Sequence, residues 1–213
     1  MKIKVCGMRD QANIKALAEL SPDYMGLIFY PESKRFADGM DRSVLEGLLP
    51  DIKITGVFVN ESPNLIISRV KEYHLQAIQL HGQESPEYCE RLKHALHTVS
   101  TGIELIKAIG IDDDFKFNTL SEYEKVIDFF LFDTKSPDHG GTGRKFNWDT
   151  LTNYISAKPY FLSGGIGLDD LHEIKKLSDE RLYAVDLNSR FEIRPAFKDM
   201  EQLSRAFEIL KTL

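Results

Sequence analysis

Long apolar runs are missing from this 213-residue sequence, and cysteine is scarce. No apolar stretch approaches the roughly 18 residues that a membrane helix needs, which argues against a membrane-spanning protein. Arg9 and Asp10 interrupt the first apolar residues, so the amino-terminal segment does not predict a signal peptide. The two cysteines, Cys6 and Cys89, are too few for a disulfide framework in a chain of this length, and we expect reduced thiols in a cytoplasmic protein.

Basic residues are also fewer than acidic ones. The chain has 27 Lys and Arg against 33 Asp and Glu, a formal net charge of −6, which argues against nucleic acid as the main partner. No linker or low-complexity segment divides the sequence. Because 42% of the residues are hydrophobic, the chain can bury a full core, and we expect one domain over residues 1–213.

The sequence alternates short apolar runs with amphipathic stretches. Ser62-Pro63 and Ser85-Pro86 each offer a helix N-cap followed by proline, and residues 200–210 have the spacing of an amphipathic helix. Most of the apolar runs are continuous, which is typical of parallel strands covered on both faces. The predicted strands are 3–7, 24–30, 54–60, 77–82, 104–110, 129–134, 159–165 and 182–189.

Eight strands, each followed by a helical or turn segment, predict an α/β fold of the (β/α)8 TIM-barrel type. A doubly wound open sheet is the alternative, but it rarely needs eight strands in so short a chain. In a (β/α)8 barrel the chemistry sits at the carboxyl ends of the strands. The polar residues predicted there are Cys6, Lys34, Arg35, Asn60, Gln79, His81, Lys107, Asp133, Asp186, Asn188 and Ser189.

The stretch SGGIGLDD, residues 163–170, favours an anion site. Its glycines let the backbone approach a ligand, and Asp169 or Asp170 is expected to cap the helix that follows. Barrels often hold phosphate between the loops after strands seven and eight, so LNSRF, residues 187–191, would supply the other half. A plain tight turn is the alternative.

The longest polar loop is 132–149, and its glycines suggest a lid, with a surface excursion as the alternative. Asp133 emerges from the apolar run FFLF, where burial favours the neutral, protonated form that an acid catalyst needs. It could instead be a capping residue. Arg35 has the geometry to bind a carboxylate or phosphate, although a lone loop arginine is more often solvated.

The histidines give no metal-binding pattern, and we expect no metal. His94 and His97 are predicted to be exposed on a helix, and Cys89 to be a packed thiol. His81 is the histidine at a strand end, where support by packing or hydrogen bonding is at least as plausible as catalysis. Cys6 could be a small buried hydrophobe or a catalytic thiol.

Taken together, the sequence resembles the phosphoribosylanthranilate isomerases of tryptophan biosynthesis. The similarity runs nearly the whole chain, and the ordered set of motifs carries it, since any one motif alone is weak. The motifs are KVCGMRD, GLIFYPESKRF, GVFVN, IQLHG, LFDTKSPDHGGTGRKFNW, FLSGGI and AVDLNSRFE.

The resemblance implies a barrel of the ribulose-phosphate-binding type, no cofactor, and a small phosphosugar substrate. It implies an Amadori rearrangement by general acid–base catalysis, with Cys6 as the base and Asp133 as the acid. Arg35 would hold the anthranilate carboxylate. Separately from the resemblance, Asp186 is predicted at the same strand end as Asn188, and a supporting role near Cys6 is a hypothesis. The phosphate would lie on Gly164, Gly165, Asn188 and Ser189, and the chain would act as a monomer or homodimer.

One segment departs from the usual family pattern of aspartate-x-serine-serine-glycine. This chain reads DLNSR, which places Asn188 and Arg190 where serine and glycine are usual. Arg190 could add a charge contact or point to solvent. Two rival functions are an aldose–ketose isomerase of histidine biosynthesis, disfavoured by the thiol at position 6, and a noncatalytic phosphate-binding barrel. A redox thiol protein is weaker, because no C-x-x-C is present.

Overall fold

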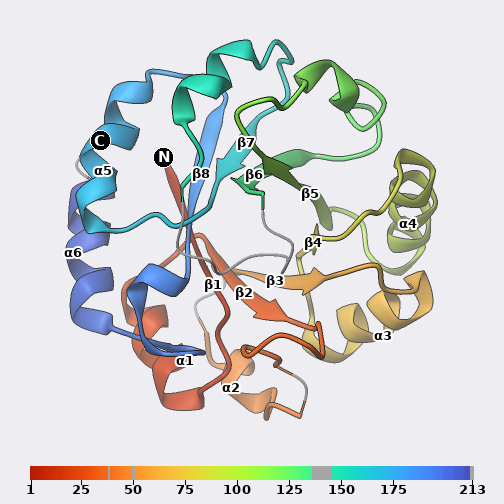
Figure 1. The fold of residues 1–213 in the computed structure, drawn as a ribbon. Helices are drawn as coiled ribbons and strands as arrows, with labels where there is room; N and C mark the ends of the chain where they lie inside the picture. Colours follow the sequence, from red (N-terminus) through yellow and green to blue (C-terminus); the bar gives the residue numbers. More distant parts are fainter. Residues whose placement is uncertain (38, 49–50, 136–144, 212–213) are drawn as a thin grey trace.

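Eight parallel strands close into a barrel in chain order (Figure 1). The structure is a computed structural model that describes residues 1–37, 39–48, 51–135 and 145–211. The barrel closes where β1 pairs with both β2 and β8, which brings Lys4 opposite Asp186. The strands are β1 Lys2–Cys6, β2 Tyr24–Ile28, β3 Lys53–Phe58, β4 Ala77–Leu80, β5 Glu104–Ile111, β6 Phe129–Thr134, β7 Tyr160–Leu162 and β8 Leu182–Leu187. The predicted (β/α)8 fold is confirmed.

Helices surround this ring of strands (Figure 1). They are α1 Gln11–Glu19, α2 Ser43–Glu46, α3 Pro63–Tyr73, α4 Pro86–Val99, α5 Leu171–Ile174 and α6 Met200–Lys211. Ser62 and Ser85 cap α3 and α4 as predicted, each accepting a backbone hydrogen bond with its hydroxyl oxygen. Short 3₁₀ turns, including Phe117–Leu120 and Trp148–Asn153, take the place of longer helices after β5 and β6. A hairpin of β9 Glu192–Arg194 and β10 Phe197–Lys198 follows β8.

The alternation of side chains along each strand divides the core in two. Side chains that point outward pack against the helices, while a smaller cluster fills the barrel interior. At the amino-terminal end, the ring of Tyr24 packs edge-on against Phe161, with centroids 5.2 Å apart, and the Tyr24 hydroxyl donates to Glu104. The interior cluster is Tyr24, Ala77, Ile106, Ala108, Leu131, Phe161 and Ala184. It fills the lower barrel, so the space for a ligand lies at the carboxyl end.

Lys107 is a strand-end prediction that the structure places elsewhere. The strand β5 continues to Ile111, so Lys107 lies in its middle rather than at its end. Ile106 and Ala108 occupy the barrel interior, and alternation therefore turns Lys107 to the outer face of the barrel. There it is buried and paired with Glu84 instead of lining the mouth of the barrel.

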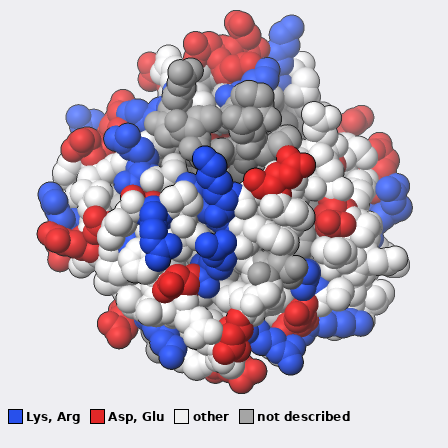
Figure 2. Space-filling model, turned by 60° about the horizontal axis from the view of Figure 1, so that its bottom comes forward, with Lys and Arg blue, Asp and Glu red and all other residues white. Residues whose placement is uncertain are grey.

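Acidic and basic side chains are mixed over much of the surface, but several Lys and Arg side chains gather near the centre of the face in Figure 2. A protein with a net charge of −6 thus carries a local concentration of positive charge. Among the described residues, no helix is both long enough and apolar enough to span a membrane.

Candidate active site

A cavity of about 540 Å³ opens at the carboxyl ends of the strands. Its walls come from elements far apart in the sequence, including β1, β4, β6 and β8, and from the loops that follow them. The lining contains the residues predicted for catalysis, binding and support: Cys6, Arg35, His81, Asp133, Gly164, Gly165, Asp186, Asn188 and Ser189. The structure therefore brings this predicted constellation into one place.

Cys6 ends β1 and points into the barrel. It is almost fully buried, and Gly26 on the neighbouring strand makes room for it, because a methyl group at Gly26 would lie 2.7 Å from Sγ. Burial raises the pKa of the Cys6 thiol, and the positive charge of Lys4 opposes that rise. Burial thus favours the neutral Cys6 thiol, while the neighbouring Lys4 ammonium favours its thiolate.

A buried ion pair lies on the same inner face of the barrel. Lys4 Nζ donates to Asp186 Oδ1 at 2.9 Å, and both side chains are buried. Lys4 is two residues before Cys6 on β1, so the two side chains point the same way. Burial alone would lower the pKa of Lys4, but Asp186 and Cys6 raise it above its ordinary value, so the ammonium stays charged.

Asp133 lines the cavity from β6, which is separated from β1 by β7 and β8. Its Oδ1 accepts a hydrogen bond from the backbone N–H of Thr134 at 2.7 Å. The backbone of Gly164, with φ of 97°, lies close to the Asp133 carboxylate, since a Cβ at Gly164 would be 2.9 Å from Oδ1. The other carboxylate oxygen, Oδ2, lies 3.4 Å from His81 Nε2.

Gln79 supports His81, a role that its strand-end position alone did not predict. Its Nε2 lies 2.8 Å from His81 Nδ1, and a Gln79 donor at that nitrogen leaves the imidazole proton on Nε2, facing Asp133. Gln79 is buried, and its Oε1 has no hydrogen-bond partner among the described residues. That oxygen is an acceptor available to a ligand hydroxyl, since Gln79 lines the cavity.

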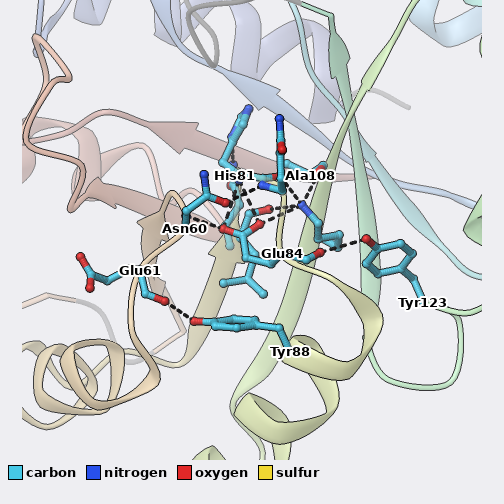
Figure 3. Close-up of polar contacts among 12 residues, drawn as sticks. Asn60, Glu61, His81, Glu84, Tyr88, Ala108 and Tyr123 are labelled. Carbon is cyan, nitrogen blue, oxygen red and sulfur yellow. Dashed lines mark hydrogen bonds and ion pairs between the residues drawn. The ribbon is translucent and has the colours of Figure 1, made fainter.

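Glu84, drawn beside His81 and Asn60 in Figure 3, fixes the loop that carries His81 together with Lys107. Glu84 accepts from the backbone N–H groups of Asn60 and Gly82, and its Oε2 lies 3.0 Å from Lys107 Nζ. Lys107 also donates to the carbonyl oxygens of Gly82 and Ala108. Sequence reasoning missed Glu84, because nothing in the pattern of loop 81–85 distinguishes a buried carboxylate from a solvated one.

Arg35 lies over Gly7 and is held from the far end of the chain. A methyl group at Gly7 would lie 2.6 Å from Arg35 Cδ, and φ of 79° also favours glycine there. Arg35 donates to Glu192 through Nε and Nη2, the latter at 2.6 Å. Lys198 Nζ donates to Glu192 at 2.8 Å and to Asn188 Oδ1 at 2.7 Å.

The two cations, Arg35 and Lys198, stabilise the negative charge of Glu192 between them. Burial would raise the pKa of Glu192, but the hydrogen bond from Arg35 and the charge of Lys198 hold it below its ordinary value. The carboxylate therefore stays ionised and orients the Arg35 guanidinium, whose Nη1 remains for a ligand. Sequence reasoning missed Glu192 and Lys198, because Arg35 and Glu192 are 157 residues apart.

The turn after β7 adopts a backbone conformation that favours glycine at two consecutive positions. Gly164 and Gly165 both have positive φ, of 97° and 65°. The capping prediction holds in part: Gly167 occupies the N-cap position and Asp170 accepts its N–H at 2.7 Å, while Asp169 is exposed. The predicted lid in loop 132–149 lies mostly outside the described residues, at 136–144.

The remaining sequence predictions concern cysteine, histidine and metals. Cys89 is fully buried in α4 and both His94 and His97 are exposed, as expected. Burial raises the pKa of Cys89 to about 11. Within the part of the chain that the structure describes, no group of three or more His, Cys, Asp or Glu side chains is placed to hold a metal ion.

A closed parallel barrel whose titratable side chains converge at the carboxyl ends of its strands defines a (β/α)8-barrel enzyme. A family model described as N-(5'phosphoribosyl)anthranilate (PRA) isomerase matches residues 3–209. The N-(5'-phosphoribosyl)anthranilate isomerase of Parabacteroides distasonis is 41% identical over 207 residues, covering 95% of this chain and 90% of its own length. The chain belongs to the N-(5'-phosphoribosyl)anthranilate isomerase family, which confirms the resemblance drawn from the motifs.

Solved structures agree with this family. The crystal structure of phosphoribosyl anthranilate isomerase from Thermotoga maritima matches with a TM-score of 0.85 and 29% identity, covering 100% of both chains. A second structure matches with a TM-score of 0.82 and 27% identity over 100% of both chains. It is a phosphoribosyl anthranilate isomerase in complex with reduced 1-(o-carboxyphenylamino)-1-deoxyribulose 5-phosphate.

The raised pKa of Cys6 predicts how fast iodoacetamide alkylates it at each pH. Only the thiolate reacts, and a raised pKa means less thiolate at any given pH, so alkylation should be slow at neutral pH. The rate should keep rising beyond about pH 8.5, where a free thiol begins to level off. Mass spectrometry of the Cys89→Ala variant isolates the Cys6 reaction. A profile that levels off at neutral pH would contradict the electrostatic description.

The Glu84–Lys107 pair predicts a stability effect. Lys107→Met leaves the Glu84 carboxylate buried without its cation and should lower the free energy of unfolding by about 3–5 kcal/mol. Urea titration followed by circular dichroism measures this. Lys93→Met, which breaks the more exposed contact of Lys93 with Asp128, is the matched control and should cost less than about 1 kcal/mol. An equal decrease in the free energy of unfolding in the two variants would mean that the buried pair is no more costly to break than the exposed one.

Proposed function

We propose that this protein catalyses the Amadori rearrangement of N-(5-phosphoribosyl)anthranilate to 1-(2-carboxyphenylamino)-1-deoxyribulose 5-phosphate, a step of tryptophan biosynthesis. The observation that carries the proposal is that Cys6 and Asp133 line one cavity, together with Arg35, Gly164 and Gly165. Membership of the isomerase family supports the same reaction.

The reaction needs an acid and a base in succession. Asp133, as the general acid, gives a proton to the ring oxygen of the ribosylamine, and the ring opens to an iminium ion whose nitrogen keeps its hydrogen. Cys6, as thiolate, then removes the proton from C2 of the sugar, and the electron pair moves to form an enaminol. Tautomerisation of the enaminol gives the ketone. One acid and one base suffice, and the proposal includes no cofactor and no metal.

Cys6 needs help to act as a base, because its burial disfavours the thiolate. The charged Lys4 ammonium provides that help, since it lowers the pKa of the thiol against the effect of burial. Asp186 holds Lys4 in place through their 2.9 Å ion pair. The supporting role of Asp186 is therefore to orient Lys4, and His81 supports Asp133 in a similar way from 3.4 Å.

The carboxylate end of the substrate would be bound by a positive charge, and the phosphate end mainly by backbone groups. Arg35 would bind the anthranilate carboxylate through the guanidinium edge that Glu192 leaves free. The phosphate would lie on Gly164, Gly165, Asn188 and Ser189, all of which line the cavity. The absence of side chains at both glycines supports this placement, because it lets the backbone approach an anion closely.

The biological setting belongs to the same proposal. The partner is the small phosphosugar substrate rather than nucleic acid or a membrane, and residues 1–213 act as one domain in a monomer or homodimer. We place the protein in the cytoplasm, consistent with reduced, buried thiols at Cys6 and Cys89.

Replacing either proton-transfer group tests the mechanism. Cys6→Ala and Asp133→Asn should each lower kcat by about a hundredfold or more, since each removes one proton transfer. The assay follows loss of anthranilate fluorescence after the substrate is made in place from anthranilate and phosphoribosyl pyrophosphate by the upstream transferase. Both variants should still bind the reduced product analogue. Wild-type turnover in either variant would remove that residue from its role, and an inactive but folded wild type would overturn the reaction itself.

Arg35→Met tests recognition of the carboxylate. It should raise KM for N-(5-phosphoribosyl)anthranilate by about tenfold, because a charge-assisted contact is lost. The phosphoribosyl derivative of aniline, which lacks the carboxylate, is the control substrate, and its KM should not change. Equal increases for both substrates would place the carboxylate elsewhere and leave Arg35 as a structural partner of Glu192.

A further inference from the structure

Arg190 lines the cavity and stands where the usual family pattern has glycine. It follows β8 directly, in the 3₁₀ turn Ser189–Phe191, and its side chain is exposed rather than packed. The same cavity wall contains Ser189, Gly164 and Gly165. Arg190 therefore stands at the rim where the loops after β7 and β8 meet.

The guanidinium reaches from one of these loops to the other. A methyl group at Gly167, in the loop after β7, would lie 3.4 Å from Arg190 Nε and 3.7 Å from Nη2. Arg190 itself belongs to the loop after β8, so its side chain bridges the gap between them. Phosphate in (β/α)8 barrels is frequently bound between these two loops.

Arg190 differs from the other cavity arginine in its charge partners. Among the described residues, no carboxylate lies within ion-pair distance of Arg190. Asp170 is the acidic group near Gly167, and its two oxygens are already engaged, Oδ1 by Lys145 Nζ and Oδ2 by the Gly167 N–H. In contrast, the Arg35 guanidinium in the same cavity is paired with Glu192.

We infer that Arg190 binds the phosphate of the substrate through its guanidinium. The inference rests on the proposed function and assigns a further binding residue to that site. The usual glycine offers the phosphate only backbone, whereas arginine adds a planar, permanently charged donor that matches phosphate oxygens. In a chain with a net charge of −6, this cation also counters the repulsion of a dianionic ligand.

Arg190→Gln removes the charge and keeps much of the side-chain length. It should raise KM for N-(5-phosphoribosyl)anthranilate by about tenfold with little change in kcat, because a charge-assisted contact to a non-reacting group is lost. Inhibition by inorganic phosphate should weaken by a similar factor. Arg190→Lys should recover part of both effects. Arg194→Gln is the control, since Arg194 packs on the Phe197 ring and does not line the cavity.

A dephosphorylated product analogue separates phosphate binding from carboxylate binding. Its affinity should be the same for wild type and Arg190→Gln, and a loss there would assign Arg190 to the carboxylate and overturn the inference. Unchanged KM and phosphate inhibition in Arg190→Gln would make Arg190 a solvated side chain and would overturn the inference as well. If the wild type proves inactive as an isomerase, calorimetric titration of ribose 5-phosphate into both proteins still decides the role of Arg190.

Discussion

Alternation of side chains along parallel strands is the constraint on which the site depends. Every second residue of a strand points into the barrel, and all eight strands run the same way, so their inward side chains form layers. On three strands, the residue two positions after an apolar interior residue lines the cavity. The pairs are Ala77 and Gln79, Leu131 and Asp133, and Phe161 and Ser163. The apolar layer excludes water from below, and the polar layer above it meets the ligand.

Each buried lysine of the described residues is held by an opposite charge. Lys4 is paired with Asp186, Lys107 with Glu84 and Lys198 with Glu192, and each lysine is almost fully buried. Such pairs contribute little net stability, but they are costly to break, so they fix geometry. The three pairs fix the surroundings of Cys6, of the His81 loop and of Arg35 respectively.

Much of this arrangement could be predicted from the sequence, because it follows from local pattern. The eight apolar runs indicated the strands, and the polar residues after them pointed to Cys6, Asp133 and Arg35. The prediction was wrong for Lys107, because Lys107 lies in the middle of β5 and alternation turns its side chain to the outer face of the barrel. Glu84, Glu192 and Lys198 could not be found, because their roles exist only through partners distant in the chain.

The hairpin of β9 and β10 lies beyond the last barrel strand, yet it starts with Glu192 and ends with Lys198, which orient Arg35. The strand before it, β8, closes the barrel on β1 and brings Asp186 to Lys4. During translation these segments leave the ribosome after the other seven strands of the barrel, and helix α6 follows them. Closure of the fold and completion of the site therefore come together, and a nascent chain that stops short of residue 198 holds Cys6 and Asp133 without a cavity ready to bind.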